Sequence, residues 1–495
     1  MLLVSVLVLG VRMAIMPLLP VPIPRVPDEF SYLLMADTFA SGRLANPPHP
    51  MWVHFETLFV NQHPTYSSVY PAMQGLFLAL GERLTGNPWV GVWFSVAILC
   101  GAICWMLQAW LPPRWALLGG FLALIQFGMF SYWINSYWGG APAGIGGALV
   151  FGAFGRLRKT PWVRNSVILG MGIAILANSR PYESLFLVIP VLVMLALLAR
   201  KLPWRVCLRQ IAIPLTLVLA ITAAATGYYF WRVTGCPWTS PYVPYMKEYA
   251  ASPIFVWEKA PAPPVYRHAV LRDAHLSFQF DSQAYQSAAG IARESFFKIG
   301  RTLSFYLGAV LFLPIVMLPW IWRDKPIRFL LIGVAGLFLG LFALVPFQLH
   351  YGAPIAGALL GLGVHSVRRL WILGRHGNPV GRILVPGCVV TCLAIQVLTY
   401  APERRPHLEY RPKIQAFLES RTGGHLVLIR YGANHFLAEE WVYNHADIDG
   451  SRVVWARDMG EANNAELVRY YKDRTVWMVE ADNFPPKLVP YGATH

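Results

Sequence analysis

Charged residues are scarce in this chain: they make up 13% of its 495 residues, whereas 56% are hydrophobic. Soluble domains carry about 25% charged residues, and disordered chains need low hydrophobicity. A water-soluble globule and a disordered chain are therefore both excluded. The apolar residues come in long unbroken runs, which favours membrane-spanning helices over alternating barrel strands. The composition predicts a polytopic helical membrane protein.

Disulfides and nucleotide-binding motifs are also missing. The six cysteines suggest no disulfide framework, because Cys100 and Cys104, like Cys388 and Cys392, lie four residues apart in apolar runs. Cysteine in such a run behaves as a small hydrophobic residue. The sequence contains neither a Walker loop nor the glycine-rich fingerprint of dinucleotide-binding folds. These absences argue against an ATP-driven pump.

Acidic residues are few compared with basic ones: 25 Asp and Glu stand against 41 Lys and Arg, a formal net charge of +16. Most of this excess lies in alternate short loops between apolar runs, where Asp324 is the only acid. The opposite short loops contain a single cation, Arg180. Since membrane proteins collect Lys and Arg in cytoplasmic loops, the charge predicts topology and not nucleic-acid binding. It places the N-terminus in the cytoplasm.

Apolar runs of adequate length recur through residues 1–401, the predicted transmembrane domain. We expect about eleven transmembrane helices, some short enough to require tilt or protein surroundings. The predicted fold class is therefore an all-α polytopic membrane protein. The runs lie at about 1–20, 90–110, 115–134, 141–155, 165–178, 184–199, 210–231, 303–322, 329–347, 354–372 and 383–401.

Three longer segments are predicted to lie outside the cytoplasm: 21–89, 232–302 and 402–495. The first opens with a proline-rich hinge and contains two stretches, about 30–41 and 70–85, that suit helices lying in the membrane interface. The second is rich in Pro, Tyr and Trp and is predicted to be an irregular loop over a site, although its aromatic residues would equally anchor the interface.

The third segment, 402–495, is predicted to be a small extracytoplasmic α/β domain. Its β-rich stretches alternate with helical patterns, which is typical of such a layer. The strands are expected at His425–Arg430, Arg452–Trp455 and Thr475–Glu480, and the helices at about 434–446 and 462–472.

Asp28 and Glu29 lie just outside the first apolar run, at the end of the proline-rich hinge. Paired carboxylates at a membrane boundary are costly unless they are partnered or hydrated. One interpretation is a general base, Asp28, that takes a proton from an acceptor hydroxyl while Glu29 assists. The other is that Asp28 caps the helix beginning near Phe30, with Glu29 favourable at its positive end. The residues alone leave both open.

The stretch from Pro27-Asp28-Glu29-Phe30-Ser31-Tyr32 to Gly42-Arg43-Leu44 resembles the first outer loop of GT-C membrane glycosyltransferases. The protein O-mannosyltransferase and aminoarabinose-transferase-like group, family 39-like, is the most similar. The resemblance covers roughly the first 400 residues in architecture. It implies many spans and a cavity for a polyprenyl-phosphate sugar. It also implies an inverting transfer with Asp28 as the catalytic base and Glu29 beside it. The missing nucleotide motifs fit such a lipid-linked donor.

A lipid-phosphate leaving group requires positive charge at the outer membrane face. Arg180 is the candidate, because a guanidinium suits a phosphate group; an ion pair with Glu183 or snorkelling to the interface is the alternative. His350 and Tyr351, at the outer end of a late apolar run, are candidates to bind the same phosphate. They would equally suit an interfacial histidine and a tyrosine of the aromatic belt.

Other outer residues are candidates for substrate contacts. His49, His54 and His63, with Glu56, suggest either hydrogen bonds to the sugar or phosphate, or plain loop structure. Their spacing matches no zinc pattern, so we expect no cofactor, with a divalent metal as the less favoured alternative. The remaining candidates have aromatic-belt or packing roles as their alternatives, and they are Tyr137, Trp138, Tyr182 and Glu183.

The sequence therefore predicts an integral membrane glycosyltransferase of the bacterial inner or plasma membrane. It would move a sugar from a polyprenyl-phosphate donor to a protein, lipid or polysaccharide acceptor outside the cytoplasm. One rival is a transporter or flippase for a lipid-linked glycan, although such a protein is expected to carry ionisable residues inside several spans, and Arg12 is nearly alone there. A second rival is a non-catalytic accessory subunit of a membrane complex.

Overall fold

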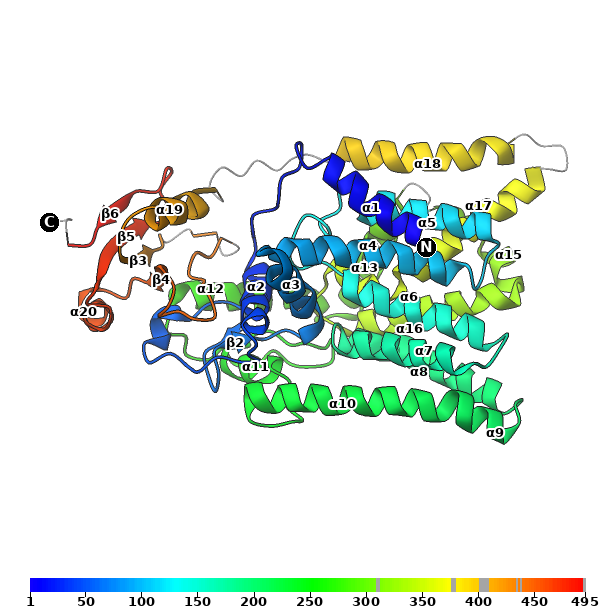
Figure 1. The fold of residues 1–495 in the computed structure, drawn as a ribbon, viewed down its shortest axis with the longest axis horizontal. Coiled ribbons are helices and arrows are strands. Elements are labelled where there is room, and N and C mark those ends of the chain that lie inside the picture. The colour runs from blue at the N-terminus through cyan, green and yellow to red at the C-terminus, as the bar shows by residue number, and fades with distance from the viewer. Residues whose placement is uncertain (309–311, 375–379, 400–408, 433–434, 437–438, 493–495) are drawn as a thin grey trace.

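The computed structural model describes the chain except for residues 309–311, 375–379, 400–408, 433–434, 437–438 and 493–495. Most of the chain is a bundle of apolar helices that run along the long axis of the molecule, and the remaining segments gather at one end of it (Figure 1). The bundle helices are α1 (Leu2–Ala14), α4 (Pro88–Leu107), α5 (Pro113–Phe127), α6 (Ala141–Leu157), α7 (Val163–Ala177), α8 (Pro181–Ala199), α9 (Trp204–Val206), the π-helical η2 (Cys207–Ala212), α10 (Ile213–Thr234), α13 (Ala288–Leu307), α14 (Phe312–Val316), α15 (Leu318–Arg323), α16 (Lys325–Ala343), α17 (Ala356–Gly374) and α18 (Val380–Thr399).

Three helical segments among the described residues are long and apolar enough to cross a membrane: Pro88–Leu107, Pro181–Ala199 and Trp204–Thr234. Five shorter apolar helices accompany them. A membrane-spanning helix was expected at 1–20, but the helix observed there is shorter: α1 has 13 residues and ends at Ala14, before the prolines of the hinge. The helical membrane architecture is thus present, and the total of about eleven crossings stays a prediction.

Arg12, the charged residue of the first apolar run, is fully buried. Its guanidinium donates to the carbonyl oxygens of Leu19 and Pro20, at 2.8 and 3.2 Å, and lies 4.6 Å from the ring centroid of Trp89. It therefore satisfies carbonyl groups just beyond the end of α1, which otherwise have no helical partner. This contact fixes the hinge that leads into the first outer segment.

Close helix packing fixes the end of the bundle where the polar segments lie. The short 3-10 helix η5 (Leu349–Ile355) packs against α6, and a Cβ atom added at Gly147 would lie 1.9 Å from the carbonyl oxygen of Pro354. Only glycine permits so close an approach, as is usual between membrane helices. The contact fixes His350 and Tyr351, which belong to η5, near the start of α6.

The first outer segment, 21–89, contains α2 (Pro27–Ala40), η1 (Trp52–Phe55), the hairpin β1 (Val60–Asn61) and β2 (Ser67–Ser68), and α3 (Ala72–Thr85). Both predicted interface helices are present. α2 is not strongly amphipathic, because α3 packs on it and the C-terminal domain covers other residues of it. α3 keeps an exposed apolar face, formed by Leu76, Leu80 and Leu84, as expected of an interface helix.

The prediction of an irregular loop at 232–302 was wrong over most of its length. It contains α11 (Tyr242–Tyr249), α12 (Ala269–Ser282), η3 (Gln283–Tyr285) and most of α13. Tyr245 and Tyr249 of α11 are buried with Leu271 and Ala274 of α12, and with Leu58 and Val69 of the first segment. Of the aromatic residues that suggested a loop, Tyr245 is thus packed on the buried face of a helix, whereas Trp238 and Trp257 are exposed in the irregular stretches on either side of α11.

The C-terminal domain holds α19 (Tyr410–Glu419), α20 (Glu461–Tyr470) and a four-stranded sheet. Its strands are β3 (Gly424–Arg430), β4 (Val453–Arg457), β5 (Arg474–Glu480) and β6 (Leu488–Pro490), in the order β4-β3-β5-β6. The first three are parallel and β6 is antiparallel. The three strands and the helix at 462–472 were predicted correctly. The helix predicted at 434–446 was wrong for residues 435–436 and 439–446, which are irregular. The domain boundary at 401/402 lies outside the described residues.

This domain packs directly on the first outer segment. Leu34, Phe55, Val60 and Tyr66 share a buried apolar cluster with residues of the sheet and of α20. We call this contact the docking interface; its polar pairs are Asp37–His445, His49–Asp449, His54–Arg457 and Tyr66–Asn444.

Candidate functional site

A second polar group lies where α2, α8, η5 and α11 meet. We call it the Asp28–Arg180 cluster: Asp28 and Tyr32 of α2, Tyr70 just before α3, Arg180 just before α8, Tyr242 of α11, and His350 and Tyr351 of η5. Five segments far apart in the sequence therefore bring one carboxylate and one guanidinium together at the end of the bundle.

Asp28 lies in the first turn of α2 and is half-buried. Its Oδ1 accepts a hydrogen bond of 2.5 Å from the Tyr70 hydroxyl. Burial raises the pKa of Asp28 above its usual value, while the Tyr70 hydrogen bond and the positive charge of Arg180 lower it in part. A carboxylate whose pKa is raised toward neutral pH accepts protons better than an exposed aspartate does.

Arg180 precedes the first turn of α8, and its guanidinium lies 4.6 Å from the ring centroid of Tyr351. In the part of the chain that the structure describes, it forms no ion pair within 4.0 Å, so the predicted pairing with Glu183 is not a close one. Glu183 is buried in the first turn of α8, and it acts on Arg180 only through its field, as Tyr32 does. A guanidinium held over a ring with no carboxylate against it has donors left for an anion.

Glu29, the neighbour of Asp28, has a structural place. One oxygen of its buried carboxylate accepts from the backbone amides of Arg25 (2.7 Å) and Val26 (3.1 Å), and the other accepts from the amide of Tyr137 (2.9 Å). Burial raises the pKa of Glu29 to about 7 although these hydrogen bonds lower it. The cap that the sequence offered as an alternative for Asp28 is thus formed by Glu29, as in a capping box.

His350 is buried beside the cluster. Its Nδ1 lies 3.2 Å from the Tyr132 hydroxyl, and its ring meets Trp138 edge to face with centroids 5.0 Å apart. Burial, and then the charge of Arg180, hold the pKa of His350 well below its usual value. His350 is therefore a neutral ring near Arg180 and contributes hydrogen bonds, not charge.

The remaining candidates of the bundle end divide into two kinds. Tyr137 fixes the hinge: its amide donates to Glu29 and its hydroxyl to the carbonyl oxygen of Pro22, at 3.0 Å. Tyr182 turns away from Asp28, since its hydroxyl donates to the carbonyl oxygen of Gly340 in α16, at 3.2 Å. Of the aromatic candidates, Trp138 alone therefore packs on a member of the cluster through its ring.

Each of the three histidines of the first segment contacts a different partner, and they do not form one cluster. His49 meets Asp449 at 3.0 Å, His54 meets the carbonyl oxygen of Arg457 at 3.2 Å, and the exposed His63 packs edge to face against Trp52. Glu56 is fully buried against Arg267, His268 and Tyr249. Among the described residues no three His, Cys, Asp or Glu side chains lie together as a metal site would require.

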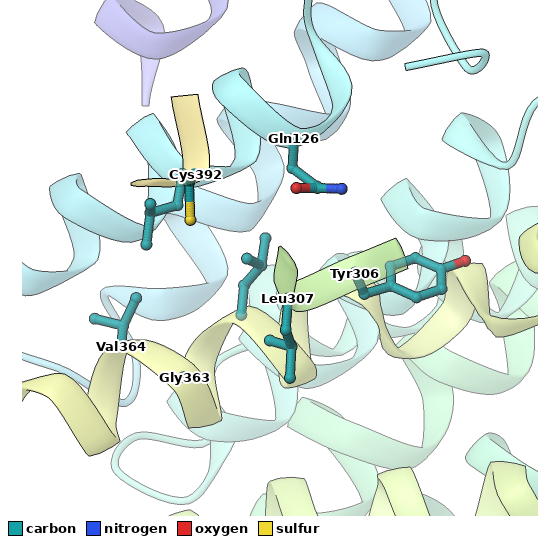
Figure 2. Close-up of a pocket in the computed structure, with 8 residues that line it drawn as sticks. Gln126, Tyr306, Leu307, Gly363, Val364 and Cys392 are labelled. Atoms are coloured by element: carbon teal, nitrogen blue, oxygen red, sulfur yellow. The ribbon is translucent and has the colours of Figure 1, made fainter. Parts of the chain in front are cut away.

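Two cavities lie in the bundle away from this cluster. A small one of about 10 Å³, room for about one water molecule, lies between α5, α13, α17 and α18; Figure 2 shows the Tyr306 hydroxyl directed away from its other lining side chains. That hydroxyl donates instead to the carbonyl oxygen of Leu349 in η5, at 2.8 Å. A larger apolar groove of about 830 Å³ lies between α8, α15 and α16, with Arg323 as its charged lining residue.

Sequence reasoning missed Tyr70 and Tyr132 as a member and a neighbour of the cluster, whereas Tyr242 was among the aromatic residues of 232–302 expected either to cover a substrate or to anchor the interface. Tyr32 stood inside the quoted motif without a role. A Tyr-Pro pair before a predicted helix marks only a helix start, and no local pattern relates residue 70 to residue 28. The signal that was available is the number of tyrosines that flank outer helix ends.

Comparison with known proteins places this architecture. Neither a protein-family model nor a curated protein matches the sequence. Solved structures do: ArnT from Cupriavidus metallidurans bound to undecaprenyl phosphate is similar, with a TM-score of 0.54 and 14% identity, over 96% of this chain and 92% of ArnT. The zinc- and sulfate-bound oligosaccharyltransferase of Archaeoglobus fulgidus is similar at a TM-score of 0.52 and 11% identity, over 96% of this chain and 67% of that one.

Both neighbours are GT-C glycosyltransferases. The fold of this chain is therefore that of the GT-C membrane glycosyltransferases, as the Asp28-Glu29 stretch predicted. At these identities the likeness establishes the fold, and the activity must be argued from the site.

Proposed function

We propose that the protein is an integral membrane glycosyltransferase that transfers a sugar from a polyprenyl-phosphate donor to an acceptor hydroxyl or amine. The observation that supports this most is that, at the end of a GT-C bundle, a carboxylate held by Tyr70 lies in the field of a guanidinium that has no carboxylate within 4.0 Å among the described residues. ArnT carries undecaprenyl phosphate in one of its structures, and the archaeal oligosaccharyltransferase carries dolichol phosphate in another. A lipid phosphate therefore suits this fold.

The chemistry follows from the two charged groups. Asp28 takes the proton of the acceptor as the acceptor attacks the anomeric carbon, while the bond from that carbon to the phosphate oxygen breaks. The lipid phosphate leaves with the bonding electrons, and Arg180 stabilises the charge that develops on it. One base and one displacement invert the anomeric configuration. Glu29 holds the first turn of α2, and His350 offers a neutral hydrogen-bonding group next to Arg180.

A metal is not part of the proposal, because Arg180 supplies a fixed positive charge for the phosphate. His49, His54, Glu56 and His63 are proposed to support the outer segments, not to bind an ion. Transfer activity should therefore survive EDTA, and a loss that Mg²⁺, Mn²⁺ or Zn²⁺ restores would contradict this part.

The proposed orientation puts the Asp28–Arg180 cluster and the C-terminal domain on the extracytoplasmic face of a bacterial plasma membrane, with the N-terminus inside. The three outer segments lie at one end of the bundle (Figure 1), as a single topology requires. A cysteine placed at Asp473 should react with a membrane-impermeant maleimide in intact cells. Labelling only after lysis would reverse the topology.

The first experiment is transfer from a panel of synthetic polyprenyl-phosphate sugars by the purified protein and by Asp28→Asn. Asp37→Asn is the matched control, because Asp37 lies on the same helix but faces the docking interface. A general base contributes about 10²- to 10⁴-fold, so Asp28→Asn should lose at least 100-fold while Asp37→Asn stays close to the parent. Equal activity in Asp28→Asn would remove Asp28 as the base. A parent that moves lipid-linked glycan between leaflets without breaking the sugar–phosphate bond would favour the transporter.

A further inference from the structure

The Tyr70 hydroxyl makes the one side-chain hydrogen bond to Asp28 that is found among the described residues, at 2.5 Å from Oδ1. It joins two segments 42 residues apart, the first turn of α2 and the residue pair that precedes α3. A short hydrogen bond to a carboxylate is among the stronger neutral-to-charged contacts in proteins. Tyr70 therefore determines how the Asp28 carboxylate is turned.

Tyr70 is itself held by two aromatic rings and through its backbone. Its ring stacks on Tyr32 with centroids 4.5 Å apart and an interplanar angle of 18°, and lies 5.8 Å from the ring of Phe59. Its amide donates to the Ser68 hydroxyl at 3.2 Å, which lies 2.7 Å from the Ser31 hydroxyl. Ser31 belongs to α2, so the contact returns to the helix that carries Asp28.

Phe59, which supports this arrangement, has the left-handed backbone angle φ of 60°. A bulky residue rarely adopts this conformation, and residues held in it cluster at functional sites. Three hydrogen bonds hold it: its amide donates to the Tyr245 hydroxyl at 3.1 Å, and its carbonyl oxygen accepts from the Ser31 hydroxyl at 2.6 Å and from the Val69 amide at 3.3 Å. The surrounding structure thus maintains an unfavourable backbone angle to keep the Phe59 ring against Tyr70.

We propose that Tyr70 is a positioning residue for the catalytic base: its hydroxyl turns the Asp28 carboxylate toward the acceptor, and the Phe59 ring keeps Tyr70 in place. The inference rests on the proposed function. It differs from a role in donor binding, in which Tyr70 would contact the phosphate or the sugar, and from a purely structural role, in which the hydrogen bond would stabilise the fold alone.

The positioning role has a pH signature. The Tyr70 hydroxyl donates to the ionised carboxylate and so lowers the pKa of Asp28 relative to the same group without it. A general base works in its deprotonated form, so activity is present above its pKa and is lost as the pH falls through it. Removing the hydroxyl should therefore move the acidic limb of the kcat/KM profile to higher pH, by about one unit for a hydrogen bond to a charged group.

The test compares Tyr70→Phe with the parent over pH 4 to 9. Tyr66→Phe is the matched control, because Tyr66 is a buried tyrosine of the same segment whose hydroxyl bonds a backbone carbonyl at the docking interface. Expected for Tyr70→Phe are a kcat about tenfold lower, a donor KM within about twofold of the parent, and the upward shift of the acidic limb. Incorporating 3,5-difluorotyrosine at position 70, a stronger donor, should shift the limb the other way even if Tyr70→Phe folds poorly.

Other outcomes overturn the inference. An acidic limb that stays in place in both the Phe and the difluorotyrosine protein would leave Tyr70 a structural residue. A higher donor KM at unchanged kcat would make it a donor-binding residue. Asp28→Asn separates this from failure of the proposed function: if that variant retains transfer, the base is elsewhere, whereas an inactive Asp28→Asn beside an unshifted Tyr70→Phe refutes the positioning role alone.

Discussion

The first outer segment contributes carboxylates to two polar regions, which differ in whether a cation or histidine lies next to each carboxylate and in the direction of its pKa shift. At the docking interface, Asp37 and Asp449 each have a histidine partner within 3.2 Å. Next to it, Glu56 pairs with Arg267 of the segment 232–302, and Glu440 pairs with Arg457 inside the C-terminal domain, both within 2.9 Å. Burial raises the pKa of these groups, but their hydrogen bonds and partner charges outweigh it, and all four lie below their usual values.

In the Asp28–Arg180 cluster the balance is the opposite. The pKa values of Asp28 and of its neighbour Glu29 lie above their usual range, because burial outweighs the hydrogen bonds that they accept, and among the described residues no cation lies within 4.0 Å of either carboxylate. Carboxylates with close cations hold segments together in their ionised form, whereas a raised pKa without a close cation is typical of a carboxylate that accepts a proton. The difference supports a structural role for the paired carboxylates and the proposed proton transfer for Asp28.

The largest effect is expected from the buried ion pair of the C-terminal domain. Arg457 donates to Glu440 at 2.5 Å and to the backbone oxygen of Glu56 at 2.6 Å, and both side chains are almost fully buried. Arg457→Met should lower the free energy of unfolding by about 3–5 kcal/mol, since it leaves a buried charge alone. Thermal unfolding measures this. The double variant Arg457→Met/Glu440→Met should recover most of the loss; if it does not, the pair is held by more than charge.

The next effect is expected at Arg180. Arg180→Ala should reduce kcat/KM by about 10²- to 10³-fold, the loss that follows removal of one group stabilising a developing negative charge. Arg180→Lys keeps the charge without the planar fork and should recover part of the rate. The matched control is Arg232→Ala, an exposed arginine at the end of α10. Arg180→Ala with unchanged transfer and unchanged binding of undecaprenyl phosphate would break the assignment of the phosphate to this cluster.

The comparison also shows what the sequence could and could not predict. Local patterns predicted α2, α3 and the strands at 425–430, 452–455 and 475–480, because helices and strands depend on neighbours along the chain. They also indicated that Asp28 and Glu29 lie at the start of a helix. They did not predict that His49 and His54 would meet Asp449 and Arg457, about 400 residues away. The local sequence around a loop histidine does not distinguish a histidine that binds a substrate from one that contacts a second domain.

The same reasoning explains the division of roles between Asp28 and Glu29. From the sequence either residue fits the first turn of a helix, and only the path of the preceding hinge decides which one caps it. The hinge places the backbone amides of Arg25 and Val26 so that they donate to the Glu29 carboxylate, and the Asp28 carboxylate accepts from the Tyr70 hydroxyl instead. The proline-rich stretch 20–27 indicated a turn but not its direction.

Glu29→Gln tests this division with an intermediate effect. Glutamine offers one acceptor oxygen where Glu29 uses two, so at least one of the three backbone amides loses its partner. We expect a loss of about 1–2 kcal/mol of stability, the usual value of a helix cap, and a decrease in transfer of less than about tenfold. Thermal unfolding and the transfer assay measure the two. A loss of transfer as large as that of Asp28→Asn would make Glu29 a second catalytic carboxylate.

The smallest effect is expected at Asp37, on the opposite side of α2 from this chemistry. Its Oδ2 accepts from the Ala446 amide at 2.7 Å and lies 3.2 Å from His445 Nδ1. The hydrogen bond with Asp37 raises the pKa of His445, with burial opposing, so this contribution is lost as the pH rises through that raised value. The pKa of Asp37 is lowered, because its bonds to His445 and Ala446 outweigh burial, and its contribution is lost as the pH falls through that lowered value.

The contact should therefore be strongest between the ordinary pKa values of 3.8 and 6.5, where both groups are charged. His445 is mostly exposed, so the pair is worth little. Asp37→Asn should speed hydrogen exchange of the Ala446 amide a few-fold relative to the parent near pH 5, and less near pH 8, with each pair compared at equal pH. An acceleration that does not change with pH would mean that the hydrogen bond from the Ala446 amide, and not the charge of His445, holds this edge of the docking interface. The contrast between carboxylates with and without a close cation would then be weaker at Asp37.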